Sequence, residues 1–253
     1  MEAEVLATPT NIGDFPGCAR FVLAPCLWQR VGCAVPVTMT EEVGMMPTST
    51  NRDVVRFFDK IAHSYDRQIG VCERFLFPRS RRWAVEHARG RVAEIAVGTG
   101  LNLPLYPADV TLVGVELSER MLALARERVT TEALADRVEL HQGDVQALQL
   151  PDASIDTVVS TFTICTIPDP AAAVREAYRV LRPGGRFVLV EHGPSDNAIL
   201  RAGMRLAEHG TARFLADHLT RDPVPLLEQT GFRVEAVSRA KAGIAFHVLA
   251  NRP

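Results

Sequence analysis

Lysine, excess basic charge and long apolar runs are all scarce in this sequence. Lys60 and Lys241 are the only lysines among 28 basic residues, a bias that we attribute to a GC-rich genome. The formal net charge is −2, whereas proteins that bind nucleic acid through its phosphates usually carry a strong basic excess, so we expect no nucleic-acid partner. No run approaches the ~20 apolar residues of a membrane-spanning helix, so we expect no transmembrane segment.

The cysteines form no recognisable framework. Five of them, at positions 18, 26, 33, 72 and 165, give an odd number without a C-x-x-C pair, which indicates neither a disulfide scaffold nor a zinc site. The first six residues contain two glutamates and no basic residue, unlike a secretory signal. We therefore expect a cytoplasmic protein with free thiols and no bound metal.

Two parts of the chain differ in their patterning. Residues 1–50 contain five prolines, little charge and no sustained period, so we predict a poorly ordered N-terminal extension. Residues 51–253 are predicted to form the functional domain, with helices in 51–90 as its lid. Helical spacing begins at Asn51 and is expected to end near Tyr65, before a second helix over 73–89. The arginines and aromatic residues of that second helix suit peripheral contact with lipid, or a solvated helix with an aromatic underside.

Apolar strands then alternate with helices. The predicted strands are 92–97, 111–115, 137–140, 155–160 and 186–191, with helices at 118–129 and 170–181 among them. Repeated β-α-β units with continuously apolar strands indicate a parallel sheet covered by helices on both faces. Strands over 232–238 and 244–250 are joined so closely that they can only pair antiparallel. We therefore predict an α/β fold with a doubly wound, mostly parallel seven-stranded sheet that ends in an antiparallel hairpin.

Residues suited to a nucleoside ligand follow the first three strands. Gly98 and Gly100 allow a tight turn in which a ligand can approach backbone N–H groups. Glu116 ends the second strand, where an acid can accept hydrogen bonds from both hydroxyls of a ribose. Asp144 follows the third strand, at the same edge of the sheet, where open α/β sheets bind ligands.

The spacing of the glycines narrows the choice of ligand. A dinucleotide fingerprint needs a third glycine where Leu103 stands, and no Walker A loop occurs. S-adenosylmethionine matches the three features that remain. These are an acid to bind its ribose, a second acid for an exocyclic amine, and a glycine turn for a small charged tail.

The sequence also resembles a known family, the class I S-adenosylmethionine-dependent methyltransferases with a Rossmann-like fold. It is similar to the ubiquinone/menaquinone-biosynthesis (type 11) branch and its phospholipid- and thiol-methylating relatives. The resemblance covers roughly residues 55–253, and it rests on five motifs in order: Phe57-Phe58-Asp59 with Tyr65-Asp66, Glu94 with Gly98-Thr99-Gly100, Val115-Glu116, Gly143-Asp144, and Leu181-Arg182-Pro183-Gly184-Gly185.

The resemblance implies a role for each matching residue. Glu94, Gly98 and Gly100 would line the methionine moiety, and Glu116 would hold the ribose. The adenine would contact Asp144 and Val145, with the Asp144 side chain accepting from its amino group. Thr161 would face the cofactor, and Tyr65 would close over the sulfonium.

Two segments depart from the family pattern. Ala96 stands where the family usually has glycine, which adds a methyl group under the cofactor turn. Residues 160–166 lack the acidic or Asn-Pro-Pro-aromatic run of enzymes that methylate amino groups of nucleic acids, and they differ from the usual quinone-methylase signature. Nucleic-acid amino groups are therefore disfavoured as the methyl acceptor, and a quinone acceptor is left open.

Three histidines could accept a proton from the methyl acceptor, because histidine titrates near neutral pH. His192 follows the fifth strand at the ligand edge of the sheet, and His218 stands beside Asp217. His63, close to Tyr65, is the third candidate.

The function predicted from these residues is methyl transfer from S-adenosylmethionine to a small lipophilic acceptor through an oxygen, nitrogen, sulfur or carbon nucleophile. Two alternatives remain at this point. One is a non-catalytic cofactor-binding subunit, and the other is an NAD-dependent oxidoreductase, which Leu103 disfavours.

Overall fold

The computed structural model describes residues 50–253 and, for Phe214, the backbone alone. The extension predicted over residues 1–50 therefore lies, apart from Thr50, outside the described residues. Residues 50–253 belong to one compact unit, in which the predicted domain lies.

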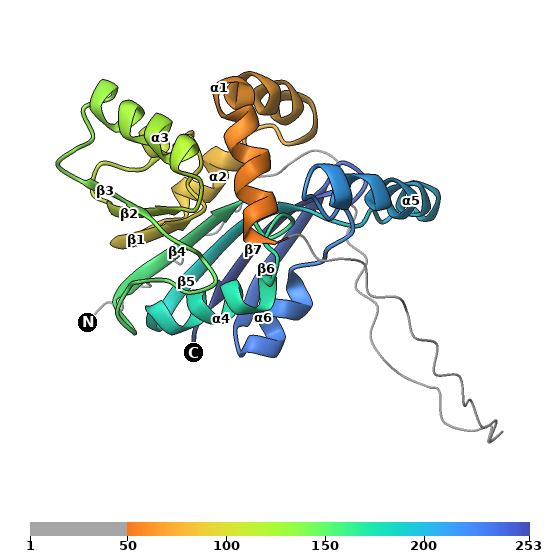
Figure 1. Cartoon of the computed structure of the whole chain (residues 1–253). Helices are drawn as coiled ribbons and strands as arrows, with labels where there is room; N and C mark the ends of the chain where they lie inside the picture. Colours follow the sequence, from red (N-terminus) through yellow and green to blue (C-terminus); the bar gives the residue numbers. More distant parts are fainter. Residues whose placement is uncertain (1–49) are drawn as a thin grey trace, which may run out of the picture. The chain divides into compact units, whose positions relative to one another are not determined.

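A single seven-stranded sheet is the centre of the described unit, in the order β3-β2-β1-β4-β5-β7-β6 (Figure 1). The strands are β1 (Arg91–Ile95), β2 (Thr111–Glu116), β3 (Val138–Gln142), β4 (Ile155–Thr161), β5 (Leu181–His192), β6 (Arg233–Ala240) and β7 (Ala245–Asn251). Strands β1 to β5 pair in parallel, whereas β7 pairs antiparallel with both β5 and β6. The predicted doubly wound sheet with an antiparallel C-terminal hairpin is confirmed.

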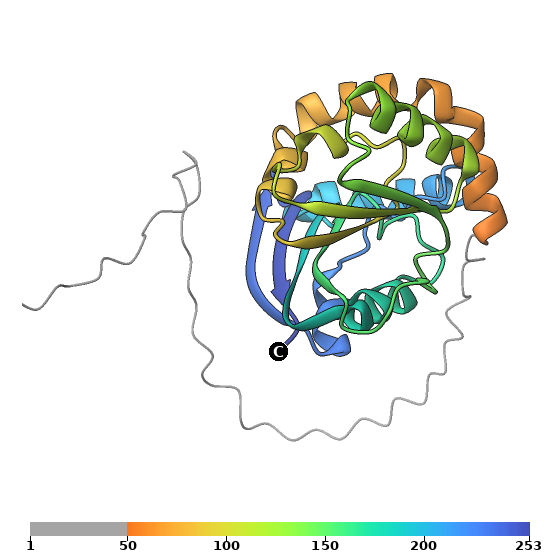
Figure 2. The ribbon, with the colours of Figure 1, turned by 90° about the vertical axis from the view of Figure 1, so that its left-hand side faces the viewer.

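Helices cover both faces of this sheet. Figure 2 shows α1 (Asn51–Leu76), α2 (Ser80–Glu86) and α3 (Glu119–Thr131) on one face, and α4 (Pro170–Val180) and α6 (Val224–Thr230) on the other. The remaining elements are the short 3-10 helix η1 (Leu103–Leu105) and the helix α5 (Ala198–Phe214). No helix among residues 50–253 is both long enough and apolar enough to cross a membrane.

The buried core has two halves because side chains alternate along each strand. On β5, Phe187 and Leu189 point into the half under α4 and α6, whereas Val188 and Val190 point into the half under α2 and α3. A strand buried on both faces must be apolar at consecutive positions, which explains why the parallel strands read as continuous apolar runs.

Helix α1 is longer than the sequence predicts. Thr50 caps it through a reciprocal capping box with Asp53, and the helix then continues through Tyr65 to Leu76. Pro78, which cannot donate a backbone hydrogen bond, separates it from α2. The predictions of a helix end near Tyr65 and of one helix over 73–89 are therefore wrong, since the chain breaks only at the proline.

Candidate functional site

A pocket lies at the carboxyl ends of β1, β2 and β4, beneath helix α1. It encloses about 620 Å³, including space that is open to solvent. Six of the eight predicted cofactor residues line it: Tyr65, Gly98, Glu116, Asp144, Val145 and Thr161. The other two, Glu94 and Gly100, are buried outside its lining. We refer to this space as the donor pocket.

The turn after β1 has the backbone conformation that glycine favours. Gly98 and Gly100 have φ angles of +59° and +80°, and a Cβ on Gly100 would lie 2.7 Å from the side chain of Leu103. Ala96, which lines the donor pocket, also has a positive φ of 52°. An L-residue is strained there, so the departure from the family glycine has a structural cost.

Glu116 is held in place by backbone donors. Its Oε2 accepts from the N–H of Gly98 and its Oε1 from the N–H of Ser118, both at 2.9 Å. Burial raises the pKa of this carboxyl, although these same hydrogen bonds lower it. Each carboxylate oxygen has a second lone pair, so Glu116 retains the capacity to accept from ribose hydroxyls.

Glu94 is a fully buried carboxyl at the base of the turn. Its Oε1 accepts from Asn102 at 2.7 Å, and the buried hydroxyl of Tyr106 lies close enough to the carboxyl to lower its pKa. Burial raises the pKa of Glu94 to about 7, and the Tyr106 hydroxyl, the Asn102 amide and the Arg81 guanidinium offset this only in part. A buried carboxyl at the base of the glycine turn suits a cationic donor such as the ammonium group of a methionine moiety.

Helix α1 is hydrogen-bonded to the donor pocket at several points. Asn51 donates to Asp144 at 2.6 Å, and Ser118 donates to Asp59 at 2.6 Å. Asp66 accepts from Thr99, within the glycine turn, at 2.5 Å. Asn51 could not be recognised as a site residue from the sequence, because it lies 93 residues from its partner.

A second pocket adjoins the first and holds the candidate proton acceptor. Its lining is shared with the donor pocket at Phe58, Tyr65, Phe162 and Thr166. The rest is mainly apolar side chains of α1, with His192, Asp217 and Cys165 among its polar groups. We refer to it as the acceptor pocket.

Phe162 and Tyr65 form the wall between the two pockets. Phe162 has a φ of 56°, unusual for a bulky residue, and its ring packs 4.8 Å from that of Phe77. Burial raises the pKa of Tyr65 to about 12, so its hydroxyl remains protonated. Strained residues that the surrounding packing holds in place are typical of functional sites.

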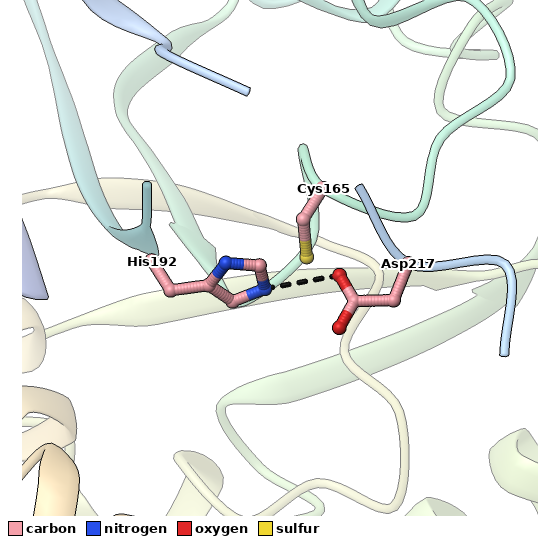
Figure 3. A group of neighbouring side chains, drawn as sticks. All are labelled: Cys165, His192 and Asp217. Carbon is pink, nitrogen blue, oxygen red and sulfur yellow. Dashed lines mark ion pairs between the residues drawn. The ribbon is translucent and has the colours of Figure 1, made fainter. Parts of the chain in front are cut away.

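His192 and Asp217 form a partly buried pair, with Nε2 of the imidazole 3.0 Å from Oδ1 of the carboxylate (Figure 3). Burial favours the neutral imidazole, but the hydrogen bond and charge of Asp217 outweigh it, so the pKa of His192 is raised. Cys165 lies beside the pair, and burial raises the pKa of its thiol well above the usual range. The pair can therefore take up a proton, while the thiol stays neutral.

The other two candidate histidines lie outside both pockets. His218 pairs with Glu208, Nδ1 to Oε1, at 3.5 Å, and burial lowers its pKa. His63 lines a polar groove with Asp66 and Arg128 instead. The sequence placed Asp217 with His218, its neighbour in the chain, whereas the structure pairs Asp217 with His192 across 25 positions.

The chain matches known proteins over most of its length. Residues 93–189 match the family described as a methyltransferase domain (Methyltransf_11). The phosphatidylethanolamine N-methyltransferase of Cereibacter sphaeroides is 41% identical over 165 residues, which are 60% of this chain and 79% of that protein. The ubiquinone/menaquinone biosynthesis C-methyltransferase UbiE of Geobacter sulfurreducens is 31% identical over 218 residues, covering 74% of this chain and 84% of that protein.

Solved structures share the fold. A SAM-dependent methyltransferase from Thermotoga maritima superimposes with a TM-score of 0.61 at 24% identity, covering 78% of this chain and 99% of that chain. The [4+2]-cyclase SpnF superimposes with a TM-score of 0.68 at 15% identity, covering 81% of this chain and 97% of that chain. The predicted cofactor and enzyme class are confirmed by the family match and the relatives, which give no support to an oxidoreductase or a non-catalytic subunit. The chain belongs to the class I S-adenosylmethionine-dependent methyltransferases of the type 11 kind.

Proposed function

We propose that this enzyme methylates the amine headgroup of a lipid, with the His192–Asp217 pair as proton acceptor. The observation that carries the proposal is the position of this pair: it stands in an apolar pocket that shares an aromatic wall with the donor pocket. The apolar lining suits a hydrocarbon chain, and the pair suits a nucleophile that must lose a proton before it reacts.

The donor pocket is proposed to hold S-adenosylmethionine in the way that the sequence predicts. When bound, this cofactor supplies an electrophilic methyl group on a sulfonium. Glu116 would accept from the ribose hydroxyls, and Asp144 from the adenine amino group beside Val145. Glu94 would accept from the methionine ammonium, next to the turn of Gly98 and Gly100.

The shared wall would set the geometry of transfer. Tyr65 and Phe162 line both pockets, as Thr166 does, so the methyl group would pass where these residues separate donor from acceptor. Aromatic faces also favour a cationic group close to them, whether a sulfonium or an ammonium. Thr161 lines only the donor pocket and would support the cofactor side of the wall.

The charge of the acceptor pocket favours an amine over an acidic acceptor. Asp217 lines it, and Glu191 lies buried directly behind its polar end, with one oxygen accepting from the backbone of Thr163 and Ile164 at 2.6 Å; Glu73 also lines it but is paired with Arg81. Arg221 lies behind the same end and donates to the backbone carbonyls of Ile164 and Ile167. A cationic headgroup is therefore attracted to the place where His192 can deprotonate it.

Proton transfer precedes the displacement. Nε2–H of neutral His192 donates to Oδ1 of Asp217, and Nδ1, which has no hydrogen-bond partner among the described residues, accepts the ammonium proton. The amine lone pair then forms the carbon–nitrogen bond while the carbon–sulfur bond breaks, and the sulfur keeps that electron pair. The role of the protein is to align the three reacting atoms and to exclude water.

The relatives support this choice of acceptor and leave one competitor. The protein with 41% identity is named for an amine lipid, and the UbiE relative for a quinone precursor. A reduced quinone whose ring carbon is activated by deprotonation of a hydroxyl is therefore the second candidate, and the same pair would serve it.

Incubation with methyl-labelled S-adenosylmethionine distinguishes the two. We expect label in phosphatidylethanolamine presented in mixed micelles, and far less in a demethylated menaquinol. Label in the quinol alone would refute the amine proposal. Label in neither, with intact cofactor binding, would refute a lipid acceptor of either kind.

Three further predictions accompany this function. We propose that α1 and α2 act as the lid, on the support of the hydrogen bonds from α1 to Thr99, Ser118 and Asp144. We also propose that the enzyme works in the cytoplasm, where its cofactor is made. Its domain is proposed to begin at residue 51, where α1 starts.

A further inference from the structure

Apolar side chains are exposed in two short segments of the chain. Among residues 50–253, seven of the nine exposed large hydrophobic residues lie in 71–76 or 199–215: Val71, Phe75, Leu76, Ile199, Leu200, Leu206 and Leu215. The other two, Leu105 and Val237, lie elsewhere in the chain. Single exposed apolar residues are ordinary, whereas concentration of this kind marks an interaction surface.

Helix α5 buries none of its described side chains. Ile199 is 85% exposed and Leu206 is 78% exposed, and their spacing of seven residues places them on one face. On the opposite face, the partly buried Glu208 binds Thr220. Figure 1 shows α5 extending outward beyond the sheet. Because helices owe most of their stability to packing, a 17-residue helix with an unpacked apolar face indicates a missing partner.

The two segments flank the acceptor pocket. Ile69 and Cys72 of α1 line the pocket from one side, and Leu215, directly after α5, lines it as well. Phe75, which is 66% exposed, lies one helical turn beyond Val71 on the outer face of α1. Each of the two segments therefore reaches the acceptor pocket at one end.

The same segments expose basic charge. Arg74 on α1 and Arg205 on α5 are exposed, and neither pairs with an acid among residues 50–253. The acids of these segments are engaged, Glu73 with Arg81 and Glu208 with Thr220. Arg81, which belongs to the arginine-rich and aromatic segment 73–89, therefore points inward to Glu73. The exposed charge of the two segments is positive.

We propose that Val71, Arg74, Phe75, Ile199, Arg205 and Leu206 form a docking surface for an anionic phospholipid bilayer. The inference rests on the proposed lipid acceptor and extends it, because a lipid could enter the acceptor pocket without crossing water. Apolar side chains would enter the interface while the arginines attract anionic headgroups, each contributing about fivefold to the partition constant. Neutral bilayers would attract the apolar residues alone.

Vesicle flotation of the full chain tests this docking surface. One set of vesicles contains phosphatidylcholine alone, and the other contains phosphatidylcholine with one-third phosphatidylglycerol. We expect the native protein to bind the anionic vesicles more tightly, and Phe75→Ser with Leu206→Ser to weaken binding at least tenfold. The matched control, Leu105→Ser with Val237→Ser, removes two exposed apolar residues elsewhere and should bind like the native protein.

The electrostatic part has its own variant. Arg74→Gln with Arg205→Gln should weaken binding to anionic vesicles roughly 25-fold, at about fivefold per arginine, and leave binding to neutral vesicles unchanged. Methylation of a short-chain, monomeric amine lipid should be the same in all these variants, since none of the six substituted residues lines either pocket.

Three results would overturn the docking proposal. The native protein could fail to bind either vesicle, or the Phe75 and Leu206 variant could bind as well as the control. In the third, light scattering would show that this variant only converts a dimer to a monomer, which would assign the surface to a second copy of the chain. Vesicle binding without methylation of any lipid would instead refute the proposed acceptor and support the docking surface.

Discussion

The substitution Glu94→Gln isolates the energetic effect of one buried carboxyl. Glutamine keeps an acceptor for Asn102 but cannot ionise. An unfolded glutamate ionises near 4.5, whereas Glu94 in the folded protein ionises at about 7. The folded protein favours the protonated form of Glu94. The contribution of this group to the free energy of unfolding is therefore fully present below pH 4.5 and is lost as the pH rises through about 7. The gap of about 2.5 pH units corresponds to about 3.4 kcal/mol at alkaline pH.

Urea unfolding of the cofactor-free protein measures this effect. Between pH 5 and pH 8, the free energy of unfolding of Glu94→Gln should rise relative to the native protein by about 2.5 kcal/mol. Other buried carboxyls cancel in this difference. The control Glu127→Gln makes the same change at an exposed position on α3.

Cofactor binding should change in the opposite direction. If Glu94 accepts from the methionine ammonium, loss of that charged hydrogen bond weakens S-adenosylmethionine binding at pH 8 by about tenfold or more. Titration calorimetry on the same two variants measures it. A stability difference that is independent of pH would refute the buried-carboxylate reasoning, and unchanged affinity would refute the assigned contact.

The remaining predictions concern three positions. His192→Gln should lower kcat by about 10²–10⁴-fold, whereas His218→Gln should leave it near the native value, as single-turnover kinetics would show. Asp217→Asn removes the charge that raises the pKa of His192, so the acid limb of the pH–rate profile should move to lower pH; an unmoved limb would contradict the pairing. Ala96→Gly relieves a positive φ and should stabilise the protein by about 1 kcal/mol in thermal unfolding, whereas a loss of stability would contradict the strain at this turn.

The sheet and the donor pocket could be predicted because their signals are local. Continuous apolar strands, the glycine turn and acids directly after β2 and β3 each lie within a few residues, and strand-end geometry then brings Glu116 and Asp144 to one edge. The predicted hairpin followed likewise from a short link between two strands.

The acceptor side could not be predicted because it depends on distant contacts. From the sequence, the neighbouring His218 is the expected partner of Asp217. In the structure, the carboxylate of Asp217 lies beyond α5 and pairs with His192 instead. The contact between Asn51 and Asp144 likewise joins segments 93 residues apart. The predicted break near Tyr65 failed for another reason, since Ser, Tyr and Asp are tolerated inside a helix that packing stabilises.

The unbroken course of α1 couples events at the two pockets. Its 26 residues span about 39 Å, with Asn51 over the donor pocket near one end and Cys72 against the acceptor pocket near the other. In the proposed function, lifting this single helix to release spent cofactor would also loosen the seat of the acceptor. Two helices joined at Tyr65 could open separately. A single continuous helix would instead couple the exit of the product to the exchange of substrate within one catalytic cycle.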